Sequence, residues 1–449
     1  MTPLSAPVAT PEATPAARRS LIHHADFRWL WGGDAFGQFG AQFTMLALPV
    51  LAVQSLAASE WQMGLLTAAE TAAFLVIGLP AGAWVDRMRK RRVLIVSDLV
   101  RALVLGVVVV LALTGHATVP LLIVGAVVIS AASVFFDVSH QSYVPGLVGL
   151  DHISEGNSKL QATQSVAQIA APAIAGTLLR FISAPALIAV NVGTYLFSAF
   201  AIGRIKHREE LPAPETHLPL REAIAEGLRF VVHQRYLRRI VATTGLSNFA
   251  GSITNAVVVI YALRTLDLGV DAFGAVMSAA AFGGLAGAFT ANRLSAWIGE
   301  GRVIALSAIA WVPGVALQPL ASVLPVPPQL TLIVGGVIST FFIVVYNVAQ
   351  VSFRQRVCPP ALLGRMNASV RFIVWGTMPL GGLVGGWLGH TFGVLPTLWV
   401  ATIGAALGSL PVVLSPLIRL RELPNDEVAG GAADDKARPD DEACAGESR

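Results

Sequence analysis

The sequence is dominated by long stretches that contain no Asp, Glu, Lys or Arg. A helix needs roughly 20 apolar residues, each adding about 1.5 Å, to cross the hydrocarbon of a bilayer. Single stretches of about this length are Ala35–Ser59, Trp61–Val85 (interrupted only by Glu70), Leu160–Leu179, Phe181–Gly203, Ile240–Leu263 and Ala272–Asn292. Longer stretches that turn signals divide into two helices each are Ala102–Phe136 (at Thr114–His116), Val303–Phe353 (at Pro325–Pro328) and Phe372–Ile418 (near His390–Pro396). The pattern predicts an all-α polytopic membrane protein with twelve transmembrane helices.

The balance of residue types excludes several other classes of protein. Of 449 residues, 54% are hydrophobic and 13% are charged, whereas soluble domains carry about 25% charged residues. A soluble enzyme and a chain disordered over most of its length are therefore excluded. Two cysteines cannot form a disulfide scaffold or a multi-cysteine metal site. The long apolar runs also differ from the short alternating strands of a membrane barrel.

Basic residues gather in alternate loops between the predicted helices. These loops carry residues 87–92, Lys159, residues 204–239, Arg293 with Arg302, and residues 354–365. The intervening loops carry only Arg180 and Arg264. By the positive-inside rule, we expect the basic loops and both termini in the cytoplasm, in a multi-pass protein of the inner or plasma membrane. The net charge of +4 then reports orientation, and we expect no nucleic-acid partner.

The loop over residues 204–239 divides the chain into two similar halves. The segment Gly78–Arg87 recurs as Gly284–Arg293, and Ala171-Pro172…Gly176 recurs as Met378-Pro379…Gly382. Each half contains an even number of predicted helices, so the two repeats are parallel and related by an axis along the membrane normal. We expect a disordered leader (1–25), a six-helix bundle (26–204), a cytoplasmic linker (205–237), a second six-helix bundle (238–418) and a disordered acidic tail (419–449).

The loop after the second predicted helix resembles a family signature. Its residues, Gly82-Ala-Trp-Val-Asp86-Arg87-Met-Arg89-Lys90-Arg91-Arg92, are similar to the G-x-x-x-D-R-x-G-R-R loop of the major facilitator superfamily, with Arg89 in place of the second glycine. Phe27–Trp31, Asp98–Ala102 and Gly364–Ala368 are similar to the drug and siderophore exporter branch, which includes the enterobactin and macrolide exporters. The resemblance implies alternating access between the bundles. It also implies a cytoplasmic gate latch at Gly82, Asp86, Arg87, Lys90 and Arg91.

Ionisable residues inside the predicted helices are candidates for proton or substrate contact, because they are costly in lipid. They are Asp34, Glu70, Asp98, Arg101 and Asp137. Asp34 and Glu70 have no obvious local partner, and proton or substrate contact is as plausible for them as structural pairing. Asp98 and Arg101 are spaced i, i+3 and favour pairing. Asp137 favours pairing or gating.

Uncharged polar residues on two other predicted helices are candidates for lining a cavity. They are Asn248, Asn255, Tyr261, Asn347 and Gln350, with interhelical hydrogen bonding as the alternative. Pro172 with Gly176, and Pro379 with Gly382, form a helix-kink motif that also favours close packing.

These features favour a secondary transporter over an enzyme. The sequence has no Walker A motif, and we expect no cofactor and no metal site. We expect a monomer that exports an amphipathic small molecule (a drug, antibiotic or siderophore) in exchange for protons across the lipid bilayer. The alternatives are an importer of a small solute and a non-transporting sensor or scaffold on the same fold.

Overall fold

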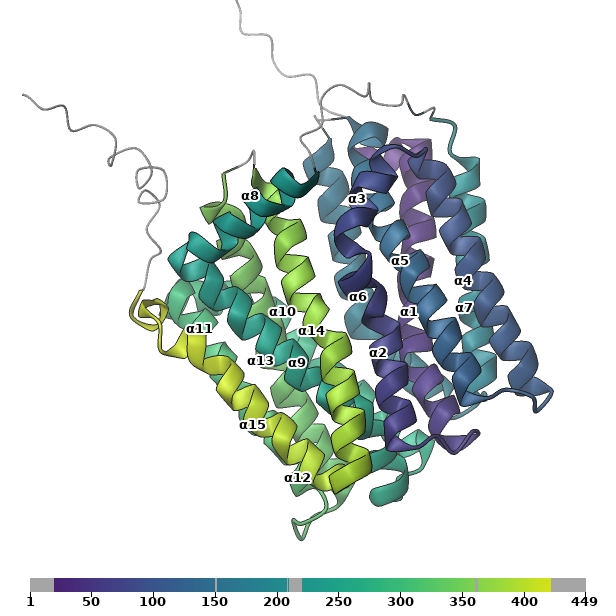
Figure 1. Cartoon of the computed structure of the whole chain (residues 1–449), viewed down its shortest axis with the longest axis vertical. Helices are drawn as coiled ribbons and strands as arrows, with labels where there is room; N and C mark the ends of the chain where they lie inside the picture. The colour runs from purple at the N-terminus through teal and green to yellow at the C-terminus, as the bar shows by residue number, and fades with distance from the viewer. Residues whose placement is uncertain (1–19, 150–151, 208, 210–219, 360–361, 421–449) are drawn as a thin grey trace, which may run out of the picture.

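The computed structural model describes residues 20–149, 152–207, 209, 220–359 and 362–420. Within these ranges the chain is helical and contains no strand (Figure 1). Ten helices are long and apolar enough to cross a membrane. Two of the twelve predicted transmembrane helices are too short or too polar to be counted among these ten. The helix α2 stops at Val76, where Ile77 leads into α3, and α6 carries Gln161, Gln164 and Gln168. The leader 1–25 and tail 419–449 lie outside the described residues except for 20–25 and 419–420.

The first half of the chain begins at a short 3-10 turn and runs to Arg204. Its helices are α1 (Ala25–Gln54), α2 (Glu60–Val76), α3 (Gly78–Asp86), α4 (Lys90–Leu113), α5 (Val119–Val148), α6 (Ile153–Leu178) and α7 (Ala184–Arg204). The expected break after α4 is present: Thr114 caps the helix and Gly115 adopts a φ of +75°. The helix α1 packs on α6 and α7, while α4 packs on α5 and α7.

The second half contains one helix that the apolar pattern did not predict. Its elements are α8 (Leu220–His233), α9 (Arg235–Ile260), a π-helical turn (Tyr261–Thr265), α10 (Val270–Ile298), α11 (Glu300–Ala310), α12 (Val312–Leu320), α13 (Pro328–Val357), α14 (Leu363–Phe392) and α15 (Val394–Val413). The helix α8 is amphipathic and packs on α9 and α14. A kink at Trp311, just before Pro313, separates α11 from α12.

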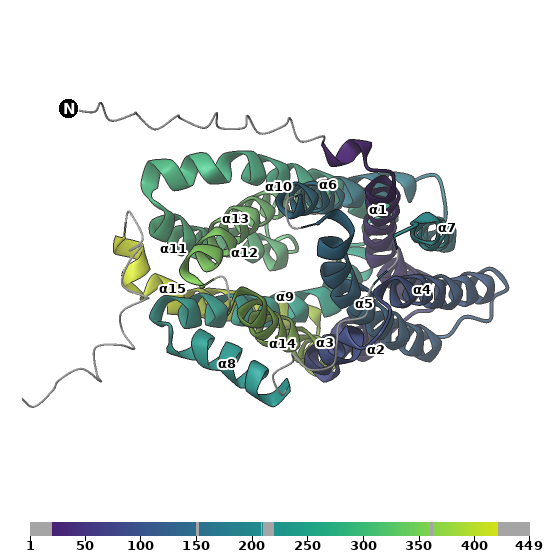
Figure 2. The same ribbon diagram turned by 90° about the horizontal axis from the view of Figure 1, so that it is seen from above.

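Two helix pairs join the halves, α2 with α14 and α6 with α10, and we call these contacts the seams (Figure 2). Glycine makes both possible. A Cβ on Gly64 would lie 2.4 Å from the Cα of Gly386, and a Cβ on Gly176 would lie 2.4 Å from the carbonyl oxygen of Gly274. Backbones can approach this closely only where neither residue carries a side chain.

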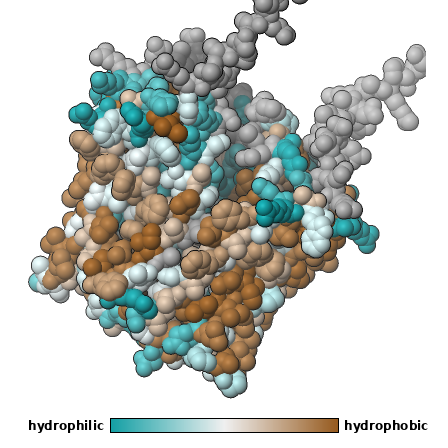
Figure 3. Space-filling view, turned by 180° about the vertical axis from the view of Figure 1, so that it is seen from behind, coloured by the Kyte–Doolittle hydropathy of each residue, from teal (hydrophilic) through white to brown (hydrophobic). Residues whose placement is uncertain are grey.

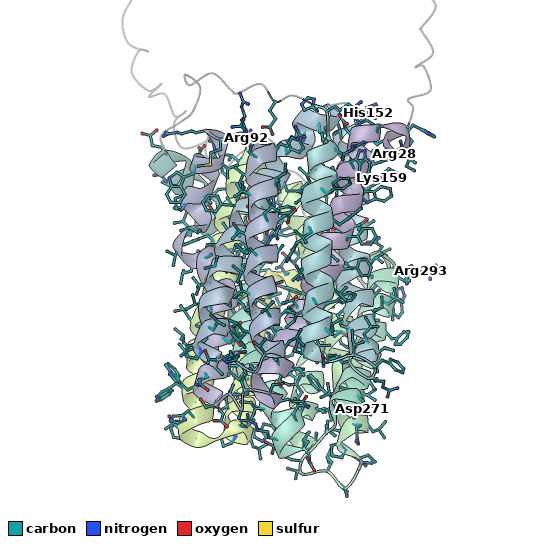
Figure 4. All side chains as sticks on the ribbon, turned by 90° about the vertical axis from the view of Figure 1, so that its right-hand side faces the viewer. Arg28, Arg92, His152, Lys159, Asp271 and Arg293 are labelled. Atoms are coloured by element: carbon teal, nitrogen blue, oxygen red, sulfur yellow. The ribbon has the colours of Figure 1, made fainter. Side chains whose placement is uncertain are left out.

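The outer surface of the protein changes from hydrophilic to hydrophobic and back again along the direction of the helices. Space-filling Figure 3 shows a broad hydrophobic band flanked by hydrophilic residues. In Figure 4, Arg28, Arg92, His152 and Lys159 lie at one end of the molecule, which we call the basic end, while Asp271 lies toward the other. Both seam glycine contacts lie toward the end opposite the basic end. The helix α2 starts at that end, four residues before Gly64, and α6 finishes there, two residues after Gly176.

Candidate functional site

A layer of charged side chains crosses the first half, and we call it the charged layer. Its members are Asp34 on α1, Asp98 and Arg101 on α4, and Asp137 and His140 on α5. Counted along their own helices at about 1.5 Å per residue, all lie roughly 12–17 Å from the basic end. Residues far apart in the sequence therefore share one depth in the protein.

Asp98 and Arg101 form the most buried pair of the charged layer. Arg101 donates a hydrogen bond to Asp98, and both side chains are almost completely buried. The guanidinium carbon of Arg101 lies 4.3 Å from the ring centre of Phe136 and 4.4 Å from that of Tyr195. Aromatic faces on two sides and a carboxylate on a third hold the cation in one position.

The Asp34 carboxyl group contacts two polar side chains, Gln38 one turn further along α1 and His140 on α5. Gln38 donates to Asp34 Oδ1 at 3.4 Å, and His140 Nε2 lies 3.8 Å from the same oxygen. The His140 ring stacks on Phe136, with 5.8 Å between ring centres. Asp34 therefore does have a partner. Sequence reasoning missed His140 because the search for charges inside helices counted only Asp, Glu, Lys and Arg.

Asp137 reaches across to the second half of the chain. Arg371 on α14 donates to Asp137 Oδ2 at 3.4 Å, with both side chains about one-third exposed. The guanidinium carbon of Arg371 also lies 4.6 Å from the ring centre of Trp375, whose ring contacts Phe74 on α2. This ion pair lies nearer the basic end than the seam glycine contacts do.

Glu70 on α2 differs from the other acids. It is half-buried, roughly 15 Å along α2 from the end opposite the basic end at about 1.5 Å per residue. Among the described residues, no hydrogen bond or ion pair involves its carboxyl group. The structure thus separates the two acids that the sequence grouped together: Asp34 faces a histidine, and the Glu70 carboxyl group has no polar partner among the described residues.

The second half contains a cavity of about 180 Å³ that both polar and apolar side chains line, none of them charged among the described residues. Its lining comes from α9, α11, α13 and α14, with the kink residue Trp311, and includes Thr243, Thr244, Ser247, Asn248, Ser252, Asn255, Ser307, Trp311, Tyr346 and Asn347. Thr244 and Tyr346 share a hydrogen bond of 2.8 Å, and Asn248 donates to the Val374 carbonyl at 3.1 Å. Asn255 and Asn347 are exposed. Hydroxyls and amides of this kind can both donate and accept hydrogen bonds.

The two remaining cavity candidates lie elsewhere. Tyr261 is completely buried, and its hydroxyl donates to the Pro319 carbonyl at 3.3 Å. Gln350 is 6% exposed and is not part of the cavity lining. Tyr261 belongs to the π-helical turn that follows α9, whereas Gln350 lies one turn beyond Tyr346 and Asn347 on the same face of α13.

The loop signature lies at the basic end, between α3 and α4. Gly82 and Asp86 belong to α3, and the surroundings of the Asp86 side chain lie outside the described part of the structure. Arg87 is exposed, and Lys90 begins α4. Arg91 donates to the carbonyls of Ile202 and Gly203, at 3.1 and 2.5 Å. It therefore binds the carboxyl end of α7 within its own half, where a cation is favoured.

The kink residues occupy the seams. Pro172 and Gly176 lie on α6, and Pro379 and Gly382 lie on α14. A Cβ on Gly382 would lie 2.9 Å from the backbone nitrogen of Ala68. No group of three or more potential metal ligands occurs among the described residues.

At the basic end, Glu155 on α6 binds Ser20 and Leu21, which precede α1. Glu155, which precedes the predicted span Leu160–Leu179, accepts hydrogen bonds from Ser20 Oγ at 2.5 Å and from the Leu21 backbone at 3.1 Å. Lys159 Nζ lies 3.4 Å from the same carboxyl group. The hydrogen bond from Ser20 is the largest of the effects that lower the Glu155 pKa below its ordinary value.

Known proteins resemble this chain in sequence and in fold. A sequence profile of the transmembrane secretion effector family matches residues 18–434. The multidrug efflux pump Tap of Mycolicibacterium fortuitum is 30% identical over 404 residues, which cover 86% of this chain and 93% of Tap. Two crystal structures share the fold at 14% identity. A bacterial homologue of the iron transporter ferroportin, in an inward-facing state, matches with a TM-score of 0.67 over 88% of this chain and 99% of its own. The nucleoside transporter NupG matches with a TM-score of 0.65 over 87% and 98%.

The family match over residues 18–434 and the 30% identity to a multidrug efflux pump, together with the apolar helices, show an integral membrane transporter of the major facilitator type, not an enzyme. Within that class, the chain belongs to the transmembrane secretion effector family. The resemblance seen in the loop signature is confirmed.

Proposed function

We propose that this protein exports an amphipathic small molecule in exchange for protons. The observation that carries the proposal is Glu70, a half-buried carboxyl group within the apolar helices that has no polar partner in the described structure. A carboxyl group in such a place can gain and lose a proton, or meet a cationic substrate. The 30% identity to a multidrug efflux pump supports export of drug-like compounds.

The proposed architecture has twelve spans in two six-helix bundles. To the ten long apolar helices we add α6 and the broken helix formed by α2 and α3. The packing of α1 with α6 and α7, and of α9 with α14 and α15, supports one bundle per half. The gathering of Arg28, Arg92 and Lys159 at the basic end supports a cytoplasmic location for that end and for both termini (Figure 4).

Alternating access is supported by the unequal contacts at the two ends. Toward the end opposite the basic end, the seams bring Gly64 against Gly386 and Gly176 against Gly274, backbone to backbone. Nearer the basic end, the partly exposed Asp137–Arg371 pair joins α5 to α14. Separating an exposed ion pair costs about 1 kcal/mol or less. The basic end is therefore the easier one to open.

Transport by inverted membrane vesicles that contain the protein would test the proposal. With an acidic interior, we expect uptake of at least one compound from a panel of fluorescent lipophilic cations and antibiotics. Glu70→Gln keeps the shape of the side chain but cannot release a proton, so we expect gradient-driven uptake to fall at least tenfold. Glu222→Gln, which alters an exposed acid on α8, is the matched control and should transport normally.

Three results would contradict the proposal. One is the absence of uptake across the whole panel by well-inserted protein. A second is uptake that ignores the pH gradient. The third is full, gradient-driven uptake by Glu70→Gln, which would remove Glu70 from the mechanism.

A further inference from the structure

The charged layer and Arg371 together hold one negative charge in excess. The carboxylates are Asp34, Asp98 and Asp137, and the guanidiniums are Arg101 and Arg371. Asp98 and Arg101 neutralise each other in a fixed, buried pair. Arg371 is the partner of Asp137, so Asp34 is left without a permanent cation. An unbalanced charge inside an apolar protein is costly.

His140 is placed to supply the missing positive charge. Its Nε2 atom is buried, lacks a hydrogen bond among the described residues, and lies 3.8 Å from Asp34 Oδ1. It also lies three residues from Asp137, one turn along the same helix. Imidazole is the side chain that ordinarily exchanges a proton near neutral pH. A proton on His140 would stand between two carboxylates.

The helices around α5 carry several charged and titratable groups whose positions the structure describes. The charged and titratable groups near it are Asp34 from α1, Asp98 and Arg101 from α4, Asp137 and Tyr143 from α5 itself, and Arg371 from α14. Glu70 on α2, and Glu155 and Lys159 on α6, make no contact with His140 in the described structure. Asp86 on α3 has a side chain outside that part.

We propose that Asp34 and His140 form a proton-binding site whose occupation weakens the Asp137–Arg371 contact between the two halves. The proton binds His140 Nε2, and the resulting imidazolium attracts Asp34 and Asp137 and repels Arg371. The effect is reciprocal by thermodynamic linkage. When Arg371 moves away, the layer has two uncompensated carboxylates instead of one, so His140 binds its proton more tightly. A proton and the guanidinium of the other half therefore compete for the same carboxylates.

Water can reach the place where this competition occurs. The side chains of Asp137 and Arg371 are 35% and 32% exposed, whereas Asp98 of the charged layer is only 1% exposed. Protons can therefore reach the layer without disturbing its structural pair. The inference uses the proposed function in one respect, since it takes the basic end as the end that opens.

Distance measurements on the full-length protein in lipid nanodiscs would test this site without any transported substrate. Spin labels would be attached in a Gln141→Cys, Ala368→Cys variant, which reports α5 against α14, after Cys358 and Cys444 are replaced by serine. Double electron–electron resonance would be recorded between pH 8 and pH 5. We expect the distance distribution to shift toward longer distances as the pH falls.

Variants identify the group responsible. His140→Gln should lose the pH response, and Asp34→Asn should shift it to lower pH by at least one unit. Asp137→Asn should give the long distance at every pH. His152→Gln, which alters a histidine at the surface of the basic end, is the matched control and should respond as the parent does.

Two outcomes would overturn the inference: no pH response in the parent protein, or an unchanged response in His140→Gln. Thermal unfolding of each variant would show whether a lost response reflects misfolding. If His140→Gln does not fold, His140→Asn replaces it. A pH response that depends on His140 in a protein without transport activity would support the site and contradict the proposed function, so the two claims can be separated.

Discussion

The two halves of this transporter hold different polar chemistry. The first half contains carboxylates, a guanidinium and a histidine at one depth, paired with one another or with Arg371. The second half surrounds its cavity with hydroxyls, amides, two aromatic rings and apolar side chains, and none of the described residues that line it is charged. Both halves contribute glycines to the seams, while their polar groups differ.

The difference bears on the two tasks of the proposed coupled transport, which are proton binding and substrate binding. Charged groups in a low-dielectric environment need fixed partners, and adding one proton changes the energy of the whole set. Neutral hydroxyls and amides can reorient and hydrogen-bond to different ligands with little change in charge. In the proposed function, the first half senses protons and the second contacts the substrate.

The largest expected effect comes from breaking the buried pair of the first half. Asp98→Ala leaves the Arg101 cation buried without its carboxylate, which should destabilise the protein by about 3–5 kcal/mol. Thermal unfolding in nanodiscs would measure the loss. The matched change in the second half is Ser307→Ala, which removes a buried hydroxyl from the cavity wall. If both variants unfold at the same temperature, the distinction between the halves has no energetic basis.

A smaller effect is expected where the halves meet. Gly64→Val places a side chain against the backbone of Gly386, and such overpacking costs about 1–3 kcal/mol. We expect lower stability and lost transport, and Gly274→Val should do the same at the other seam. Gly37→Ala, where a Cβ meets nothing within 4 Å, is the control. A defect in one seam variant only, seen in parallel vesicle assays, would mean that the seams are not equivalent.

Changes in the cavity should alter affinity more than coupling. Tyr346→Phe removes a hydroxyl from the cavity wall. In the proposed function this hydroxyl exchanges its bond to Thr244 for one to the substrate, worth about 0.5–1.5 kcal/mol, so its loss should raise KM up to about tenfold. The pH dependence of transport should remain as in the parent protein. A shifted pH profile measured by vesicle uptake would show that the second half also takes part in proton coupling.

The smallest effect concerns Glu155 at the basic end. Its pKa is lowered in the folded protein, so its contribution to stability is fully present above the ordinary carboxyl value and is lost as the pH falls through the lowered one. Hydrogen exchange at the Leu21 amide should accelerate in that acidic window. In Glu155→Gln the exchange should be fast at neutral pH already. Equal protection in both proteins would exclude this anchor.

The arrangement of apolar helices could be predicted well from the sequence. Charge-free stretches and the breaks at Thr114–His116 and Pro325–Pro328 recur as helices and helix ends, because lipid leaves the backbone few alternatives. The amphipathic α8 was missed since its apolar residues are interleaved with charged ones. The π-helical turn at Tyr261 was missed because it continues an apolar run.

The polar contacts were harder to predict, since they join residues that are distant in the sequence. The spacing of Asp98 and Arg101 reveals their pair, but no spacing links Asp34 to His140 or Asp137 to Arg371. The role of Arg91 in a gate between the halves stays a prediction. In the structure Arg91 binds the end of α7 in its own half. Only the packing of α4 against α7 shows this.

The depth of the charged layer has an electrical consequence. His140 lies roughly 12 Å along α5 from the basic end, at about 1.5 Å per residue, so a bound proton sits inside the field of an energised membrane. Moving one elementary charge through the whole field is worth about 2.3 kcal/mol per 100 mV. A proton that stops at His140 experiences part of that energy, and displacement of Arg371 moves a second charge through the same region. Turnover should therefore respond to voltage even when the pH is equal on both sides.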